Sequence, residues 1–178
     1  MEYPWYKVAE GDGLQQGDFL DACPVIEPPP TFRVPEKPGA MKEVPLRIQT
    51  YNVVILTQTC DLEQEHVSLV LVCPCWPLSK VEEYSSHFRS RRGKEDIRRG
   101  NVPGYHMLAA CELDSFRREI RVVDFRTVFS LSLHFVKNFA AQQSPRLRLL
   151  PPYREHLAQA FARFFMRVGL PVDIPPFG

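Results

Sequence analysis

The sequence predicts an α+β domain that is mostly β-sheet, and two patterns are the basis of this prediction. The first is a pair of apolar, β-branched runs over residues 47–57 and 67–75, which is typical of neighbouring strands. The second run is apolar at odd and even positions alike, so we expect a central strand buried on both faces. The other pattern is an amphipathic run over 152–168, which has the periodicity of a helix.

Length and composition are those of one globular domain. The chain has 178 residues, of which 44% are hydrophobic and 24% are charged, as is common for globular proteins. We therefore treat 1–178 as a single domain. No apolar stretch approaches the roughly 20 residues that cross a bilayer, and no signal-peptide pattern is present. We expect a cytoplasmic protein without a membrane partner, and the five irregularly spaced cysteines argue against a disulfide framework.

Proline is the compositional outlier, with 17 residues. Six of them fall between Pro28 and Pro45, where the missing N–H and the restricted backbone exclude a helix or a central strand. We expect residues 28–46 to form an extended proline-rich loop or arm. The stretch before it, 17–26, is typical of a Gly-Asp turn that leads into a strand.

A helix and a hairpin are predicted after the second strand. Ser79 and Glu82 match a capping box, and the helix that they begin should end near Gly93 or, after a break, near Gly100. Two apolar runs, 105–113 and 119–125, then predict a hairpin around Asp114-Ser115.

The last part of the chain contains an ambiguous run and the clearest helix. Residues 128–139 fit either a strand or a helix. The helix over 152–168 is opened by two prolines and ended by a glycine and a proline. One apolar stripe on it should face the core: Leu157, Phe161, Phe164, Phe165 and Val168.

This order of elements resembles the MazF/PemK family of growth inhibitors. The resemblance is carried by Gly17-Asp18-Phe19, by Asn52 to Gln58 and by Leu71 to Ser79, while Val122 to Val128 and the last helix occupy comparable places. It implies a small SH3-like β-barrel with one inserted helix and a C-terminal helix.

The chain departs from this family at the residues that carry its chemistry. Family toxins place an Arg-Pro pair just before the second strand, and that arginine takes part in RNA cleavage. Here Thr50, Tyr51 and Asn52 occupy the stretch, and the family's catalytic Thr or Ser has no counterpart. We therefore assign no catalytic residue.

The loop between the two strands is the first candidate site. Its polar corner consists of Thr57, Gln58, Cys60 and Asp61. A nucleophilic Cys60 would need a histidine to lower its pKa, and His66, His106 and His134 are the candidates. Asp61 would raise that pKa, so we favour a structural corner in which Asp61 accepts backbone hydrogen bonds.

Zinc binding is the second interpretation of this region. Cys60, His66, Cys73 and Cys75 are zinc-binding residue types, but the spacing C-x5-H-x6-C-x-C is not one that structural zinc sites use. Buried core thiols are the favoured alternative. We predict no metal site and no cofactor, and a small metal-binding regulator is the third functional hypothesis.

The second candidate site is a basic segment after the predicted strands. Residues 80–99 hold seven basic and four acidic side chains. Arginine binds phosphate in a bidentate manner, and Phe88 or Tyr105 could stack on a base. The alternative is a solvated helix face paired with Glu95 and Asp96. The candidate nucleic-acid-binding residues are Arg89, Arg91, Arg92, Lys94, Arg98 and Arg99.

The sequence therefore favours a non-catalytic protein-interaction module, with nucleic-acid contact as an option, in a bacterial defence, toxin–antitoxin-like or signalling system. A protein partner would bind the proline-rich loop or the barrel edge, and RNA is the alternative partner. The alternative function is a MazF/PemK-like endoribonuclease toxin with relocated catalytic residues.

Overall fold

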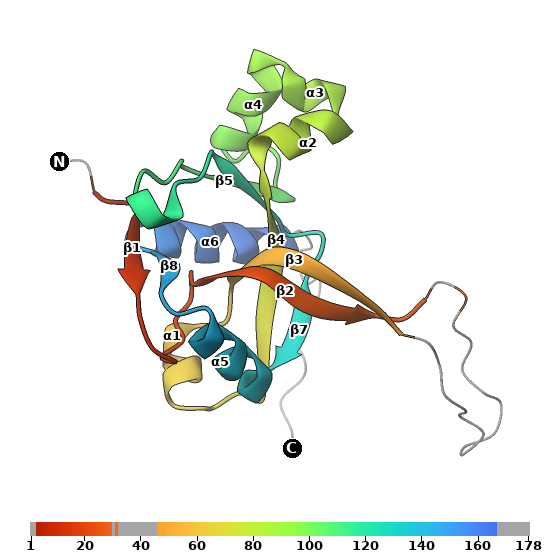
Figure 1. Cartoon of the computed structure of the whole chain (residues 1–178). Coiled ribbons are helices and arrows are strands. Elements are labelled where there is room, and N and C mark those ends of the chain that lie inside the picture. The colour runs from red at the N-terminus through yellow and green to blue at the C-terminus, as the bar shows by residue number, and fades with distance from the viewer. Residues whose placement is uncertain (1–2, 30, 32–45, 167–178) are drawn as a thin grey trace, which may run out of the picture.

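The structure is a computed structural model that describes residues 3–29, 31 and 46–166. It is an α+β fold in which helices and strands occupy comparable lengths of chain. Figure 1 shows a central sheet with a two-stranded arm on one side and a group of short helices at one end. No helix in the described part of the chain is long and apolar enough to cross a membrane. Most of the predicted proline-rich segment, 28–46, lies outside the described residues.

The main sheet has five strands in one antiparallel path, β2-β3-β4-β6-β5, and a sixth strand, β7, that pairs with the first half of β4. β4 is central because it pairs with β3 along one edge and with both β6 and β7 along the other. No pairing among the described residues joins the two ends of the path, so the sheet is not closed into a barrel. The strands are β2 (Phe19–Glu27), β3 (Arg47–Ile55), β4 (Leu69–Pro77), β5 (Tyr105–Leu108), β6 (Arg121–Asp124) and β7 (Phe129–Ser132).

The predicted central strand is buried on both faces only in its second half. Val70 and Val72 are fully buried, but Leu69 and Leu71 are 53% and 37% exposed. Successive side chains of a strand point to opposite faces, and the outer face of this half of β4 is open to solvent. The prediction of complete burial was therefore wrong for these two leucines.

A second, two-stranded sheet was not predicted. It pairs β1 (Tyr6–Ala9) with β8 (Arg146–Leu149), and the N–H of Leu149 donates to the carbonyl of Gly17 at 2.9 Å. Gly17 has φ +86°, and a Cβ there would lie 3.0 Å from Cβ of Leu149. The Gly-Asp turn thus needs its glycine because it is the junction of the two sheets.

A buried ion cluster holds the same junction. Asp18 is fully buried, and Arg146 Nε and Arg148 Nη2 donate to its Oδ2 at 2.9 and 2.8 Å, while Arg148 Nε donates to Oδ1. Arg146 Nη1 donates to the carbonyl of Gly11, and Nη2 of Arg146 and of Arg148 both donate to the carbonyl of Gly13. The cluster therefore ties the first loop, the start of β2 and β8 together.

Three short helices occupy the stretch where the sequence predicted a helix that ends near Gly93 or, after a break, near Gly100. They are α2 (Leu78–Tyr84), α3 (Ser86–Arg89) and α4 (Arg91–Arg98), and we call them the helical cap. The chain is extended at Ser85 and at Ser90, whose hydroxyl accepts a hydrogen bond from the N–H of Gly93 at 2.9 Å. The predicted capping box is wrong, because Pro77 is the N-cap of α2 and the Ser79 hydroxyl donates to Glu119 at 2.8 Å.

The hairpin prediction is confirmed, and the ambiguous run contains both kinds of element. β5 pairs with β6, and a 3-10 turn over Asp114–Phe116 lies between them. The run 128–139 begins as β7 and continues into α5 (Leu133–Gln142). A short helix in the polar corner, α1 (Thr59–Glu63), was not predicted.

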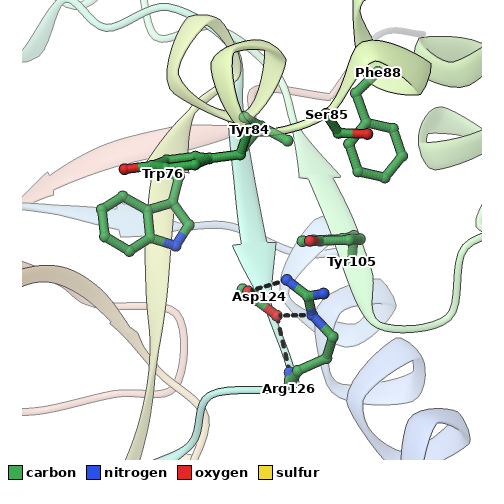
Figure 2. A pocket seen from close by; sticks show the side chains of 8 residues that line it. Trp76, Tyr84, Ser85, Phe88, Tyr105, Asp124 and Arg126 are labelled. Atoms are coloured by element: carbon green, nitrogen blue, oxygen red, sulfur yellow. Dashed lines mark hydrogen bonds and ion pairs between the residues drawn. The ribbon is translucent and has the colours of Figure 1, made fainter.

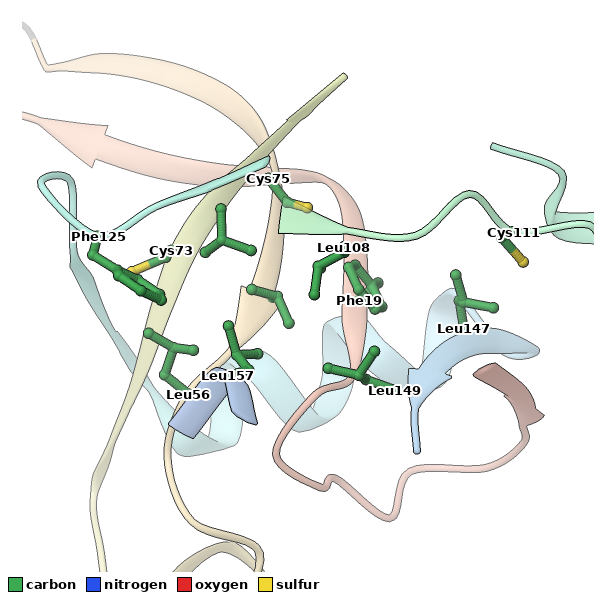
Figure 3. Packing of buried hydrophobic residues seen from close by; sticks show 12 residues of the cluster. Phe19, Leu56, Cys73, Cys75, Leu108, Cys111, Phe125, Leu147, Leu149 and Leu157 are labelled. Atoms are coloured by element: carbon green, nitrogen blue, oxygen red, sulfur yellow. The ribbon is translucent and has the colours of Figure 1, made fainter. Parts of the chain in front are cut away.

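The C-terminal helix, α6 (Tyr153–Phe165), packs on the main core as predicted. Figure 3 shows Leu157 among the buried side chains of this core, close to Phe125 and Leu149. Phe161 and Phe164 pack against the same cluster. Phe165 is 60% exposed because the helix ends at this residue, beyond the cluster, and Val168 lies outside the described residues.

Candidate functional site

The predicted polar corner is a structural junction. The Thr57 hydroxyl accepts a hydrogen bond from the N–H of Leu71 at 2.7 Å. The Thr59 hydroxyl accepts one from the N–H of Gln16 at 3.2 Å. Among the described contacts these threonine hydroxyls connect the corner to β4 and to the first loop, which is the role that the sequence analysis gave to Asp61.

No cysteine–histidine pair forms at this corner. Gln58 is the exposed N-cap of α1, and Cys60 is exposed with its sulfur 4.0 Å from the Asp61 carboxylate. His66 is also exposed, in the loop after α1. The arrangement matches the structural interpretation rather than a nucleophile.

The other thiols of the region lie in the core. Cys73 and Cys75 are buried, and burial raises the pKa of each to about 12. They are therefore protonated at neutral pH. Across residues 3–29, 31 and 46–166, no three His, Cys, Asp or Glu side chains come together in a way that could hold a metal ion.

Most of the predicted nucleic-acid-binding residues are used within the helical cap. Arg98 donates to both oxygens of Glu95 at 2.7 and 2.6 Å, and Arg99 donates to the same carboxylate at 2.6 Å. Lys94 pairs with Glu82 at 3.0 Å. Arg89 donates to two backbone carbonyl groups at the end of α2. This is the paired helix face that the sequence analysis offered as the alternative.

Arg91 and Arg92 differ from the other four basic residues. Both are exposed in the first turn of α4, and neither has an ion-pair partner among the described residues. They are the cations of the basic segment that stay available for an external anion.

A concave site of about 500 Å³ lies where the helical cap meets the main sheet. Figure 2 shows Trp76 and Tyr105 on opposite sides of the space, with Tyr84 above and an Asp124–Arg126 pair at the base. We call this site the aromatic pocket. Its lining residues are Trp76, Val81, Tyr84, Ser85, Phe88, Tyr105, Asp124 and Arg126.

The walls of the aromatic pocket are positioned by packing between cap and sheet. Phe88 is buried and meets the Tyr105 ring edge-on, with 5.3 Å between the ring centroids. The Trp76 ring is supported by Tyr51, whose ring lies edge-on at 6.0 Å. Tyr84, in contrast, is 77% exposed and forms the rim. The rings of Phe88, Tyr105 and Trp76 are therefore held by packing contacts, whereas the ring of Tyr84 is exposed at the entrance.

The base of the aromatic pocket carries a neutralised charge pair. Asp124 is buried, and Arg126 donates to its two oxygens at 2.8 and 2.7 Å. The guanidinium group lies over the Tyr105 ring, 4.3 Å from its centroid. Burial and the nearby Asp124 raise the pKa of Tyr105, so its phenol is protonated at neutral pH. The pocket thus presents flat rings without a net charge.

The aromatic pocket offers several surfaces on which a ligand could pack. Flat aromatic faces pack on rings and on the carbon skeleton of ligands. Figure 2 shows the indole nitrogen of Trp76 turned toward the open space, and no described residue accepts a hydrogen bond from it. Ser85 contributes a hydroxyl group to the pocket, and none of the described lining residues is a histidine that could act as its base. The pocket therefore offers a donor and stacking surfaces, but no nucleophile–base pair.

The sequence analysis found two members of this pocket and missed the others. Phe88 and Tyr105 were named as stacking residues, but only as companions of the arginines. Trp76 and Tyr84 belong to elements that looked separate in the sequence. Aromatic density was no signal, because residues 76–105 hold four aromatic residues in thirty, close to the 11% of the whole chain.

Comparison with known proteins adds no relative. No protein-family model matches this chain, and a search of curated proteins finds no match. The resemblance to MazF/PemK growth inhibitors therefore rests on the order of elements and the stretches quoted above, and it stays a prediction.

Proposed function

We propose that this chain is a non-catalytic protein-interaction module that binds an extended, proline-containing segment of a partner protein in the aromatic pocket. The observation that carries the proposal is the wall of four aromatic side chains around a space of about 500 Å³. Proline rings pack well on flat aromatic faces, and a preformed polyproline II segment loses little entropy on binding. The free indole N–H of Trp76 is a donor for a carbonyl group of such a segment.

The charge distribution favours a protein over a nucleic acid as the ligand. Binding to a phosphate backbone depends on several free cations. Here Arg98, Arg99 and Lys94 are held by acidic neighbours, and Arg126 is held by Asp124. A largely uncharged peptide segment suits a pocket of this kind.

The proposed setting is a cytoplasmic component of a bacterial defence, toxin–antitoxin-like or signalling system. Its support is the order of elements, which resembles MazF/PemK proteins with their SH3-like barrel, together with the missing Arg-Pro pair. In this proposal the proline-rich loop, 28–46, and the edge of the sheet are further surfaces for protein partners.

Fluorescence of Trp76 tests the proposed ligand class. The chain has two tryptophans, and Trp5 stacks on Tyr153 with 3.6 Å between the ring centroids. Trp5→Phe keeps that stacking and leaves Trp76 as the reporter. A synthetic oligoproline peptide should change its emission saturably, and Tyr84→Ala should weaken binding by about threefold to tenfold, because it removes one aromatic contact at the rim.

A matched control separates the pocket from general surface effects. Tyr3 is another exposed tyrosine, at 56%, and Tyr3→Ala should leave peptide binding unchanged. Partners captured from the native host should likewise be lost with Tyr84→Ala and kept with Tyr3→Ala. Equal behaviour of the two variants, or an emission that oligoproline leaves unchanged, would rule out the aromatic pocket as the peptide site.

A second candidate function is an endoribonuclease with relocated catalytic residues. Arg91 and Arg92 favour it, because they are exposed without described partners on the cap that covers the aromatic pocket. Expression should then arrest growth, and Arg91→Ala/Arg92→Ala should relieve the arrest, whereas the exposed Arg117→Ala should not. Intact cellular RNA after incubation with concentrated protein would exclude this function.

A further inference from the structure

One aromatic side chain, Tyr51, connects the aromatic pocket to a second concave region. Its ring lies edge-on to Trp76, with 6.0 Å between the ring centroids, and is tilted against Phe129, with 5.0 Å between the centroids. Trp76 is a wall of the aromatic pocket, and Phe129 lines a groove of about 580 Å³. The three rings therefore form a continuous row from one concave region to the other.

The second region, which we call the apolar groove, lies between the β2–β3 arm and β7 (Figure 1). Ile26 and Ile48 are paired across the arm and are 60% and 66% exposed. On the other side are Phe129 and Leu131 of β7, which are partly buried. None of the described residues that line the groove is charged. An exposed apolar surface of this kind is typical of an interaction site, and it suits a ligand with uncharged, apolar side chains.

Tyr51 is held in place by hydrogen bonds to the arm. Its hydroxyl donates to the Glu27 carboxylate at 2.7 Å and lies 3.1 Å from Oε1 of Gln49. Because these bonds fix the ring between Trp76 and Phe129, the row of rings exists before any ligand binds. A preformed surface lowers the entropy that is lost on binding.

β7 offers unused main-chain groups beside the apolar groove. Ser130 lies opposite Leu71 of β4, whose N–H donates to the Thr57 hydroxyl at 2.7 Å and whose carbonyl accepts from the N–H of Leu56 at 2.9 Å. The peptide groups of this opposed pair point away from each other, and no described residue forms a hydrogen bond with the N–H or carbonyl of Ser130. An extended segment can add to an open edge of this kind.

The row of rings sets the length of a ligand that reaches both regions. The two centroid distances, 6.0 and 5.0 Å, limit the separation of Trp76 and Phe129 to 11 Å. A polyproline II segment advances about 3.1 Å per residue, so roughly three or four residues cover this separation. A proline on Trp76 and an apolar side chain three or four residues away therefore contact both regions at once.

We propose that the partner segment continues from the aromatic pocket over Tyr51 into the apolar groove, where alternate apolar side chains pack and its main chain bonds to the open edge of β7. The partner is then a protein with a proline run next to a short apolar strand. Strand addition of this type draws affinity from main-chain bonds and specificity from the side-chain pockets. This inference rests on the proposed function, because the proline run occupies the aromatic pocket.

Paired synthetic peptides test the inference in the Trp5→Phe protein, with Trp76 as the fluorescent reporter. One peptide is oligoproline alone. The others carry a Val-Thr-Val extension at either end of the oligoproline, each with a matched Ser-Thr-Ser control. One of the two valine peptides should bind at least about tenfold more tightly than its serine control, as expected for burial of an apolar side chain.

Variants of the protein assign this gain to the apolar groove. Ile48→Thr removes exposed apolar surface from the groove but keeps a β-branched side chain, and it should remove the gain while oligoproline binding stays unchanged. Leu69→Thr is the matched control, because Leu69 is 53% exposed but does not line the groove. It should leave the binding of every peptide unchanged. Tyr84→Ala should weaken the valine peptide and oligoproline alike.

Amide hydrogen exchange locates the bound extension. The Ser130 amide should exchange about tenfold more slowly when the tighter valine peptide is bound, and it should not slow with oligoproline alone. A Ser130 amide that is protected without peptide and loses this protection on strong dilution would place a second copy of the chain in the groove, and would overturn the inference.

The peptide series separates failure of this inference from failure of the proposed function. If oligoproline binds but both valine peptides bind no more tightly than their serine controls, the apolar groove is not part of the site and the proposed function stands. A gain that Ile48→Thr leaves intact has the same meaning. If no peptide binds, the proposed function fails and this inference fails with it.

Discussion

At the scale of single residues, burial decides which cysteine can react. Cys23, Cys73, Cys75 and Cys111 are buried, and Cys60 is exposed. Burial raises the pKa of Cys23 to about 11, in addition to the effect on Cys73 and Cys75 described above. Only the thiolate is nucleophilic, so buried and protonated thiols are inert.

We therefore predict that one of the five thiols reacts readily with a thiol-specific reagent in the native protein, and that all five react after unfolding. The absorbance of the chromophore that the reagent releases gives the number of thiols that have reacted. Cys60→Ser should leave the native protein unreactive. Fast reaction of a second native thiol would show that the core opens at ordinary temperature.

His106 makes the stability of the protein depend on pH. Its ring stacks on Phe125, and burial, together with nearby His156, lowers its pKa to about 4 from the ordinary 6.5. Above 6.5 the histidine is neutral in both states. Between pH 6.5 and 4 the unfolded chain binds a proton at this histidine and the native state does not. The free energy of unfolding therefore decreases as the pH is lowered through this range, by at most roughly 3 kcal/mol.

Urea unfolding of His106→Gln at several pH values measures this contribution. The variant should lose less stability than the parent protein between pH 6.5 and 4, because residue 106 no longer titrates. The exposed His66→Gln is the control and should follow the parent. Parallel pH curves for all three proteins would show that His106 charges freely in the native state.

At the scale of elements, the helical cap depends on a close approach between two of its helices. Gly93 lies in α4, and a Cβ there would be 2.0 Å from the carbonyl oxygen of His87 in α3. No real Cβ tolerates this distance, so any side chain must move α3. Phe88, the next residue of α3, is a wall of the aromatic pocket. The packing of two short helices thus controls the shape of the pocket.

Gly93→Ala should therefore lower the free energy of unfolding by about 1–3 kcal/mol, as overpacking does elsewhere, and should weaken oligoproline binding. Chemical denaturation and Trp76 fluorescence measure the two effects. Gly13→Ala is the matched control, because its Cβ would meet no atom within 4 Å. Wild-type stability of Gly93→Ala would contradict the close contact.

At the scale of the whole molecule, one carboxylate joins the two sheets. Asp18 directly precedes β2, and both arginines of β8 bind it in a buried environment. Removing one member of a buried ion cluster leaves the other charges without compensation. The connection between the sheets is therefore more sensitive to this residue than to any exposed ion pair.

Asp18→Asn should lower the free energy of unfolding by about 3–5 kcal/mol, because two buried guanidinium groups lose their counter-charge. Thermal and urea unfolding measure the loss. Asp12→Asn, an exposed change in the same loop, should have little effect. A mild phenotype for Asp18→Asn would mean that water enters the junction and solvates both arginines.

The sequence by itself determined the local elements whose patterns are strong. β3, β4, the β5–β6 hairpin and α6 follow from apolar alternation, turn residues and helical periodicity, which act over a few neighbouring residues. It also determined the character of Cys73 and Cys75 as core residues, because an apolar strand buries its small side chains. Weak local patterns were less informative: a helix with at most one break was expected, whereas Ser85 and Ser90 divide the cap into three helices.

Only the tertiary structure decided the sites. The aromatic pocket is lined by residues from four elements, namely Trp76, Tyr84, Tyr105 and Asp124. Their spacing in the sequence does not predict that their side chains surround one space. The same holds for β8, because only the folded chain brings Asp18 beside Arg146, which lies 128 residues later in the sequence. Local propensity acts along the chain, whereas pockets and buried charge clusters depend on contacts between distant segments, which the folded packing alone specifies.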